Sequence, residues 1–339
     1  MSVTIKDIAR VLGISPSTVS RALKDHPDIA AETKRAVKEL AEELNYQPDP
    51  IALSLKKRQS HIIGVLVPEI VHYFFSTVIS GIEDLAYASG YRVMICQSNE
   101  NFSHEVKNID ALLASRVDGI LVSLSKETTS YRHLENIVEQ RVPMVMFDRV
   151  AESLRVDKVV VDDLNGAYKA VSHLIEMGCR RIIHYGTAQY LAIGKNRREG
   201  YLRALADHNL PKRDEDIVRC DLYEDAVRIT RGMMQRSPKP DAFFAVNDFT
   251  AIGTIKTLQE LGYRVPEDVA VVGFTNGQIA DVISPALTSV EQFGYNLGKT
   301  AVELLLERLN VPGKTIPART RTIKTKLIIK ASSLRKKIT

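Results

Sequence analysis

The sequence has few cysteines and no cluster of metal ligands, and both absences limit what the protein can be. Its 339 residues include three cysteines, Cys96, Cys179 and Cys220, which are odd in number and widely spaced. This usage indicates reduced thiols, so we expect three core residues rather than a disulfide framework. No histidines and cysteines stand at metal-ligand spacing, and the sequence therefore predicts neither a metal nor a cofactor.

Long apolar runs are also missing. No run approaches the 18 apolar residues that a membrane-crossing helix requires. The N-terminus lacks the basic and apolar segments of a secretory signal. With 45% hydrophobic and 26% charged residues, the chain has the composition of a globular protein that is long enough for two or three domains. We expect a cytoplasmic protein without a membrane partner.

Acidic residues are absent from residues 308–339, which carry ten basic residues. Residues 1–60 have a net charge of +2, so the overall charge of +5 leaves −7 for residues 61–307. An acidic body with basic ends could repel nucleic acid broadly and bind it at one place. The C-terminal charges have a simpler explanation, because TRTIKTKLIIK (320–330) alternates like a strand whose charges face solvent.

The first residues predict two short helices joined by a tight turn. Thr4 is an N-cap candidate, and the apolar stripe that follows it ends at Gly13. Ser15 is a second N-cap candidate, followed by Pro16 at the first helical position, where a missing N–H costs nothing. A third helix is expected over 32–45. Three short helices with a glycine turn between the first two form a helix-turn-helix unit.

The second of these helices has the surface of a recognition helix. Small hydroxyl side chains near its start would let the backbone approach DNA, and Arg21 can bond O6 and N7 of a guanine together. An ordinary solvated helical hairpin would show the same periodicity, so periodicity alone leaves both interpretations open.

The residues themselves are more specific. VTIKDIARVLGISPSTVSRALKDHPDIAAETKRAVKELAEELNYQPDPIALSLKK (3–57) closely resembles the DNA-binding region of the LacI/GalR family of bacterial transcription regulators, with TIKDIA, S-x-x-TVSRAL and NYxP in order and at family spacing. The resemblance implies a helix-turn-helix domain over 1–48. It implies base-facing positions for Pro16, Ser17 and Arg21, and positions near phosphates for Thr4, Ser15, Ser20 and Tyr46.

Residues 49–60 correspond to the hinge helix of that family, which folds only on DNA. There two copies, one from each subunit of a dimer, meet in the minor groove. Leu55 matches the leucine that enters between base pairs, and Lys56 and Lys57 match positions at the flanking phosphates. Leu53 stands where the family commonly has arginine, so one minor-groove or phosphate contact is expected to be missing.

From residue 61 the pattern changes to strands alternating with helices. The predicted strands are 62–70, 91–98, 117–124, 143–150, 159–163, 180–186, 216–222, 241–248 and 269–276. The predicted helices are 75–89, 103–116, 165–177, 196–208 and 249–261. This alternation predicts parallel sheets with both faces covered, and the strands suffice for two sheets.

The body of the chain also resembles the family, through FDR, R-x-x-GY, ND-x-x-A-x-G and PALTSVEQ. The resemblance implies an α/β effector domain over 61–339 of the periplasmic-binding-protein type, with a ligand between two lobes. Lobe 1 is expected to comprise about 61–161 and 293–321, and lobe 2 about 162–292 and 322–339.

Polar residues follow several predicted strands, where ligands of parallel sheets bind. Carboxylates, amides and arginines with a ring suit a sugar's hydroxyls and C–H surface. Singly, each Asp or Asn is as well explained by a turn or a helix cap. By position in the family, eight residues line the cleft: Phe74, Ser125, Asp148, Arg149, Arg197, Asn247, Asp248 and Thr275.

Thr275 departs from the family, which usually has Asp there. With Arg149 and Arg197 kept, the loss of that charge predicts a more cationic cleft and an acidic saccharide as effector. Together these features predict a non-enzymatic, ligand-responsive regulator, expected to be a repressor. It would bind a pseudo-palindromic operator as a homodimer, lie on the nucleoid when bound, and respond to a small carbohydrate or sugar acid through reciprocal coupling of about 1–3 kcal/mol.

Other functions remain open. The same class of regulator could sense a nucleobase or a protein corepressor, although Leu222 stands where an aromatic residue would stack on a base. A secreted sugar binder would leave the helix-turn-helix unexplained. A DNA-binding enzyme acting on a sugar would need catalytic groups, and the sequence has no G-x-S-x-G, Walker-type loop or metal set.

Overall fold

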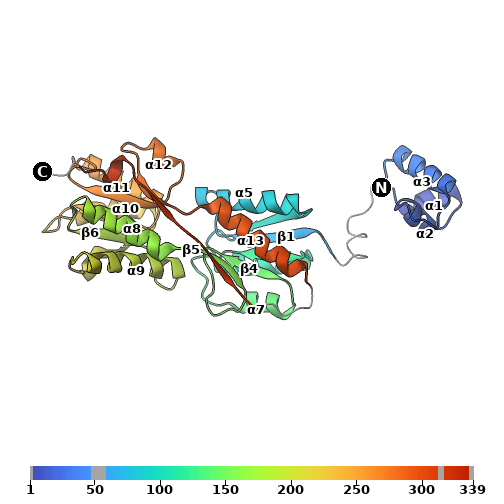
Figure 1. Cartoon of the computed structure of the whole chain (residues 1–339), viewed down its shortest axis with the longest axis horizontal. Coiled ribbons are helices and arrows are strands. Elements are labelled where there is room, and N and C mark those ends of the chain that lie inside the picture. The colour runs from blue at the N-terminus through green and yellow to red at the C-terminus, as the bar shows by residue number, and fades with distance from the viewer. Residues whose placement is uncertain (1–2, 47–58, 312–316, 336–339) are drawn as a thin grey trace. The chain divides into compact units, whose positions relative to one another are not determined.

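The computed structural model describes residues 3–46, 59–311 and 317–335. The chain divides into two compact units, one ending at His61 and the other beginning at Ile62 (Figure 1). Most of the predicted hinge, including Leu55, Lys56 and Lys57, lies outside the described residues.

The first unit is a bundle of three helices, and the predicted helix-turn-helix is confirmed. α1 spans Ile5–Leu12, α2 spans Pro16–Ala22 and α3 spans Ala31–Glu43. The backbone N–H and the hydroxyl of Thr4 both donate to the Asp7 carboxylate, at 3.0 and 2.7 Å, which fixes the start of α1. The side chains at the centre of the bundle are fully buried: Ile8, Val19, Ala22 and Val37.

The ends of these helices have local causes. Gly13 ends α1 with a φ of +65°, which glycine adopts without strain. Ser15 caps α2, since its Oγ accepts the Thr18 N–H at 3.1 Å. α3 ends at Glu43, short of the predicted 45, and Asn45 has already left the helix with a φ of +47°.

The second unit contains two six-stranded sheets. The strands of the first sheet are β1 (Ile62–Val67), β2 (Arg92–Gln97), β3 (Gly119–Val122), β4 (Met144–Phe147), β5 (Asp157–Val161) and β11 (Thr320–Ile323). Those of the second are β6 (Ile182–Gly186), β7 (Ile217–Arg219), β8 (Ala242–Ala245), β9 (Ala270–Thr275), β10 (Thr288–Glu291) and β12 (Lys326–Ile328).

Both sheets have the same topology. Their orders are β11-β5-β4-β3-β1-β2 and β12-β10-β9-β8-β6-β7. The paired strands run parallel, except that β12 is antiparallel to β10. The predicted pair of parallel sheets is therefore confirmed, and the body of the chain is an internal structural repeat.

Helices cover both faces of each sheet. On the first sheet, α5 (Tyr73–Ala88) and α13 (Gly294–Leu309) share one apolar core, and α6 (Phe102–Ala114) and α7 (Arg132–Glu139) the other. On the second sheet, the pairs are α8 (Asp163–Glu176) with α9 (Ala192–Asp207), and α10 (Tyr223–Met233) with α11 (Asp248–Glu260). A short α12 (Ile279–Val282) follows β9. We call each sheet with its helices lobe 1 and lobe 2, respectively.

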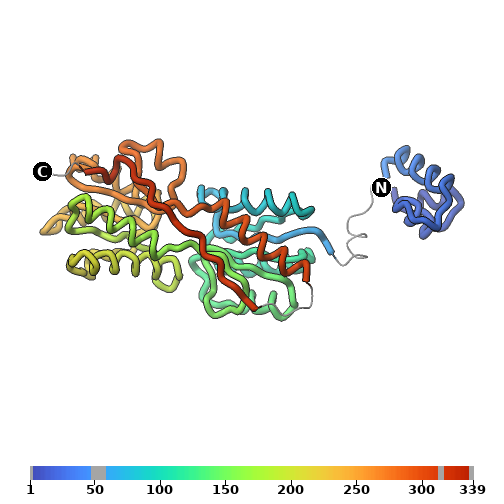
Figure 2. The backbone as a smooth tube through the Cα atoms, in the orientation of Figure 1, coloured from blue at the N-terminus to red at the C-terminus, as the bar shows by residue number. Residues whose placement is uncertain are grey.

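The chain passes between the lobes three times: after β5, after β10, and between β11 and β12. The last passage was expected after residue 321, but β11 continues to Ile323, which pairs with Val161. The stretch expected to be one alternating strand is therefore divided between two sheets (Figure 2). No helix of the described residues is both long and apolar enough to cross a membrane.

Helices α5 and α13 pack backbone to backbone because glycines face the contact. A Cβ added at Gly81 would lie 2.1 Å from the Tyr295 carbonyl oxygen, and one added at Gly298 would lie 2.1 Å from that of Val78. Real Cβ atoms do not approach backbone so closely, so neither position accepts a larger residue without moving a helix.

We expect Gly298→Ala to lower the free energy of unfolding by about 1–3 kcal/mol, because the added methyl forces the two helices apart. Gly232→Ala in α10 is the matched control. Nothing lies within 4 Å of a Cβ there, so the change should leave stability unchanged or raise it by up to about 1 kcal/mol. Urea unfolding of the full chain measures both, and equal effects of the two substitutions would contradict the packing argument.

Candidate DNA-binding surface and effector cleft

The residues predicted to face bases lie on the outside of α2. Pro16, Ser17 and Arg21 are exposed, and Ser20 is half-buried. The Ser15 hydroxyl lies 2.7 Å from the Ser17 hydroxyl. The start of α2 therefore presents a compact group of small polar side chains, with an extended guanidinium one turn later.

The cations of the first unit differ in whether they form ion pairs. Three of them are paired with carboxylates: Arg10 with Asp7 at 2.9 Å, Lys38 with Asp25 at 2.7 Å, and Arg35 with Glu39 at 3.9 Å. Within residues 3–46, the lysines and arginines without an ion pair are Lys6, Arg21, Lys24 and Lys34, of which Lys34 lies on α3. Three of these four charges are therefore on or just after the helix-turn-helix, where a phosphate backbone would need them.

Thr4 and Tyr46, the predicted phosphate contacts outside α2, differ in how far they are exposed. Thr4 is exposed at the start of α1. Tyr46 is half-buried against the core of the bundle, and its backbone N–H donates to the Ala41 carbonyl at 2.8 Å. Tyr46 therefore packs on the bundle three residues before the predicted hinge begins.

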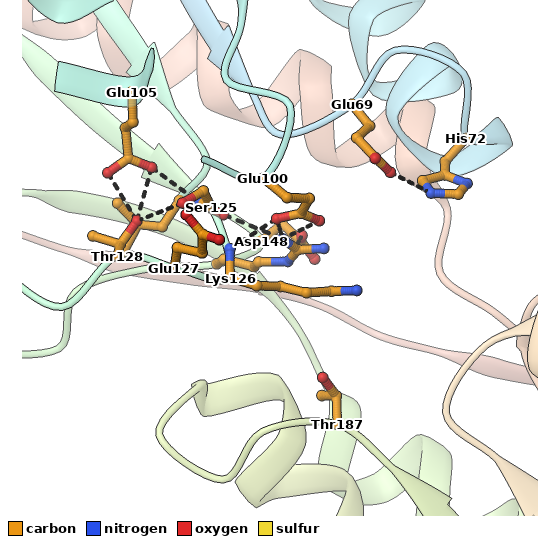
Figure 3. Close-up of polar contacts among 12 residues, drawn as sticks. Glu69, His72, Glu100, Glu105, Ser125, Lys126, Glu127, Thr128, Asp148 and Thr187 are labelled. Atoms are coloured by element: carbon orange, nitrogen blue, oxygen red, sulfur yellow. Dashed lines mark hydrogen bonds and ion pairs between the residues drawn. The ribbon is translucent and has the colours of Figure 1, made fainter. Parts of the chain in front are cut away.

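Direct contacts join the two lobes at their strand ends. Lys126, beyond β3, makes an ion pair of 3.2 Å with Asp221, which follows β7. The Tyr190 hydroxyl of lobe 2 donates to the Lys126 carbonyl. On the other side the His72 and Phe249 rings lie 5.8 Å apart. Figure 3 shows Lys126 extending from lobe 1 beside Glu100 and Asp148, with Thr187 on the lobe 2 side.

Asp148 follows β4 directly and is the most available carboxylate of the cleft. It is buried and has a φ of +57°. Its carboxylate accepts no hydrogen bond from a described residue, and the Arg149 Nε lies 4.0 Å from one of its oxygens. Burial raises its pKa to about 6. Asp148 and Asp163 line one cavity of about 290 Å³, together with Asn196 and Thr320. An acceptor held in this way suits a hydroxyl-bearing ligand.

The two cleft arginines are each neutralised by a carboxylate. Arg149 Nη1 lies 2.7 and 2.8 Å from the Glu100 carboxylate oxygens. Arg197 Nε and Nη2 lie 2.8 and 2.7 Å from Asp163 Oδ1. The Arg197 guanidinium also lies 3.7 Å from the centre of the Phe274 ring. Both arginines are buried.

The prediction of an unusually cationic cleft is therefore wrong. The sequence identified the arginines but not their partners, and Lys126 is paired with Asp221 as well. The argument for an acidic saccharide, which depended on that excess charge, is lost.

On lobe 2 the predicted residues serve both the fold and the cleft wall. Asn247 caps α11, since its Oδ1 accepts the Thr250 N–H at 2.8 Å. Asp248 accepts the Ser289 hydroxyl at 2.5 Å and the Gly277 N–H at 2.8 Å. The Thr275 hydroxyl donates to Gln292 at 3.0 Å, and its φ of +140° is strained for a β-branched residue.

Ser125 is held by a network that the sequence did not reveal. Its N–H donates to Glu105 Oε2 at 2.7 Å, and the Thr128 hydroxyl bonds the same fully buried carboxylate at 2.8 Å (Figure 3). His133 Nε2 lies 2.9 Å from this carboxylate as well. Glu105 therefore fixes the loop that carries Ser125 and Lys126. Nothing in its sequence position on α6 indicates this role.

Phe74 lies elsewhere than the cleft-facing prediction suggests. It is buried in the apolar core between α5 and α13, and its ring meets that of Phe75 edge-on at 5.3 Å. The neighbouring Tyr73 is partly exposed instead, and a Cβ added at Gly277 of lobe 2 would lie 3.3 Å from its ring. Of the predicted cleft residues, Arg197 lies on α9 and Phe74 on α5, and the others follow or end a strand: Ser125, Asp148, Arg149, Asn247, Asp248 and Thr275. No group of three or more potential metal ligands occurs among the described residues.

Comparison with known proteins fits this architecture. Residues 4–49 match the bacterial regulatory proteins of the lacI family, and residues 171–333 match a periplasmic binding protein-like domain. Over 307 residues the chain is 36% identical to the HTH-type transcriptional repressor PurR of Vibrio atlanticus, covering 90% of this chain and 92% of the relative. The chain belongs to the LacI/GalR family. It is also 31% identical to the ribose operon repressor of Halalkalibacterium halodurans, with 97% of each chain covered.

Solved structures agree with this membership. A complex of the transcriptional regulator CelR with cellobiose has a TM-score of 0.75 at 27% identity, covering 97% of this chain and 99% of that one. The lac repressor dimer bound to operator and the anti-inducer ONPF has a TM-score of 0.85 at 23% identity, covering 98% and 100%, and shows the shared fold. This LacI/GalR member is a DNA-binding, ligand-responsive transcriptional regulator, and the PurR and ribose operon relatives are named as repressors.

Asp248 generates a pH prediction. Burial raises its pKa to about 6, from 3.8. The folded chain therefore binds the Asp248 proton more tightly than the unfolded chain does. The protonated carboxyl adds to the free energy of unfolding at low pH, and this contribution is lost as the pH rises through about 6. Between about pH 4.5 and about pH 7 that loss is about 2 kcal/mol. We expect Asp248→Asn to remove it, as measured by chemical unfolding at both pH values.

Asp268→Asn is the control, because the pH dependence of its effect on stability is expected to have the opposite sign. Hydrogen bonds from Arg264 lower the pKa of the exposed Asp268 to about 2, so its stabilisation is present at neutral pH and is lost on acidification. A pH dependence in Asp248→Asn identical to that of the native chain would contradict the assignment.

Proposed function

We propose that this regulator is a repressor that binds a pseudo-palindromic operator as a homodimer and responds to a neutral carbohydrate held between its lobes. The observation that carries the proposal is a contrast in charge. Lys6, Arg21 and Lys24 on or just after the helix-turn-helix make no ion pair with a described residue. Lys126, Arg149 and Arg197 at the cleft are paired with carboxylates. One surface is therefore prepared for a polyanion and the other for an uncharged ligand.

The DNA side of the proposal rests on Arg21. Its guanidinium is exposed on α2 next to the small side chains of Pro16 and Ser17, and no carboxylate of residues 3–46 occupies it. A bidentate contact to guanine requires such a free fork. The hydroxyls of Thr4, Ser15 and Ser20 and the ring of Tyr46 would then fix the register on phosphates, with Leu55, Lys56 and Lys57 supplying the hinge contacts.

The effector side rests on Asp148 and its surroundings. The carboxylate accepts no hydrogen bond from a described residue, and the Arg149 Nε lies 4.0 Å from it. Ser125, Arg197 and Asn247 are held in place by the contacts given above. A neutral sugar would supply hydroxyl donors to Asp148 without disturbing either arginine pair. The relatives agree with this class, since one is named as a ribose operon repressor and one structure contains cellobiose.

Coupling between the two sites would run through the contacts that join the lobes. A ligand that changes the Lys126–Asp221 ion pair or the bond from Tyr190 changes how lobe 1 sits on lobe 2. In a dimer this changes the separation of the two hinge segments. The coupling is reciprocal, so operator DNA must change effector affinity by the same factor.

Selection of random duplex DNA by the full chain tests the DNA-binding part. We expect a pseudo-palindrome with a pyrimidine–purine step at its centre. Arg21→Ala should weaken binding to the selected sequence by about 1–3 kcal/mol, roughly 5- to 150-fold, and reduce preference at one base position in each half-site. Arg35→Ala on α3, whose side chain is paired with Glu39, is the control and should change affinity less. Selection of sequences without two-fold symmetry would refute the dimeric operator.

A ligand panel tests the effector. We expect one neutral sugar, and not its uronate, to raise the melting temperature of the full chain. Asp148→Asn should weaken that sugar about tenfold or more, because it replaces a charged acceptor, whereas Asp225→Asn on the outside of lobe 2 should not. Titration calorimetry measures both affinities. Equal binding of sugar and uronate, or binding of a purine or pyrimidine base alone, would refute the neutral carbohydrate.

A further inference from the structure

A second and larger cavity lies in lobe 2, beside the edge strand β7. Its volume is about 720 Å³, and its wall comprises β7, the end of β6 with the loop 187–190, Arg198 of α9 and the segment before β7. None of the eight residues predicted for the effector cleft lines it. It is therefore a separate cavity that needs its own explanation.

The wall of this cavity is basic. It contains Arg198, Lys212 and Arg219, against a single carboxylate, Asp214, which pairs with Lys212 at 3.2 Å. The side chains of Arg198 and Arg219 make no ion pair or hydrogen bond with any described residue. The Nε atom of Arg198 is buried without a partner. A buried guanidinium nitrogen without an acceptor is costly.

Arg198 and Arg219 differ from the buried arginines of this lobe, since Arg198 is half-buried and Arg219 is exposed. Arg181 pairs with Asp216 at 2.8 Å, and Arg197 with Asp163 at 2.7 Å. Buried arginines of lobe 2 thus obtain carboxylates from the fold. Arg198 and Arg219, which share one cavity, leave their donors available for an anion from solution.

A hydrogen-bond acceptor, the Nε2 atom of His184, lies beside the cavity wall at Gly186. A Cβ added to Gly186, which lines the cavity, would be 3.0 Å from His184 Nε2. His184 is fully buried, and burial lowers its pKa to about 4, so the ring is neutral. Its Nδ1 lies 3.3 Å from the Phe244 carbonyl and donates to it, which leaves Nε2 as an acceptor without a partner. A hydroxyl group beside Gly186 could satisfy it.

We propose that this cavity is a second ligand site, for a small phosphorylated polyhydroxy compound. Two free guanidinium groups match the oxygens of a phosphate, and an ammonium adds charge. The acceptor behind Gly186 suits a hydroxyl of the same molecule, and the volume suits a compound of a few carbons. Thr187 and Tyr190, which line the cavity, also bond Asp221 and the Lys126 carbonyl, so an occupant would touch the contact between the lobes.

Calorimetry on the full chain tests this, with ribose 5-phosphate and glycerol 3-phosphate as probes and ribose and glycerol as their neutral counterparts. We expect the phosphorylated probes to bind and Arg219→Gln and Arg198→Gln each to weaken them at least tenfold. Lys256→Gln, which removes an exposed charge of the same lobe, should have no effect. Thermal melting verifies that each variant is folded.

Two further variants locate the bound phosphate. Arg21→Ala and Asp148→Asn should leave phosphate binding unchanged, so this result is independent of the operator and the neutral effector. Absence of binding, or binding that survives both Arg198→Gln and Arg219→Gln, would refute the second site. Loss of phosphate binding in Asp148→Asn would refute it too, because the probe would then occupy the interlobe cleft.

Discussion

Parallel strand pairing is the constraint from which the effector domain follows. Strands that all run in one direction end at one edge of their sheet, and every connection must leave from that edge. For this reason Asp148 follows β4 at one edge of the first sheet. Thr275 and Asp221 lie at one edge of the second sheet, at the ends of β9 and β7. The positive φ angles of Asp148, Thr275 and Asn276 lie at the same edges, where the chain must turn sharply out of a buried strand.

The charged groups gathered at these edges would be costly to bury unpaired, and the fold pairs cations with carboxylates there. Buried arginines and carboxylates are costly alone, so Arg197 lies against Asp163 and Arg149 against Glu100. This pairing leaves Asp148 as an acceptor and leaves the cleft without excess positive charge. At the β7 edge this pairing is absent, since the Arg198 and Arg219 side chains have no carboxylate partner among the described residues. Both phosphate sites that we propose, on the helix-turn-helix and in the β7 cavity, contain cations without a carboxylate partner.

Much of the fold could be predicted because its signals are local. The cap at Ser15, the glycine turn at Gly13 and the apolar strands such as Ile62–Val67 depend on residues adjacent in sequence. The candidate cleft residues were found through family position and strand ends. What the sequence could not supply was pairing across long separations, such as Glu105 with His133 or Arg197 with Asp163. The division of residues 320–328 between the lobes was expected from the family resemblance, but the alternating pattern did not give its position, which lies after Ile323 rather than after residue 321.

That division links the order of synthesis to the order of folding. Lobe 1 begins with β1 at Ile62, but one face of its core needs α13, and its edge strand is β11. Lobe 2 takes β12 from the same stretch, a few residues later. Neither lobe can be complete on the ribosome until residues 320–328 have emerged, so the two lobes must finish folding together, long after the helix-turn-helix has formed its own core. A nascent chain that is halted before residue 320 would carry two open sheet edges and a DNA-binding unit without a regulatory body.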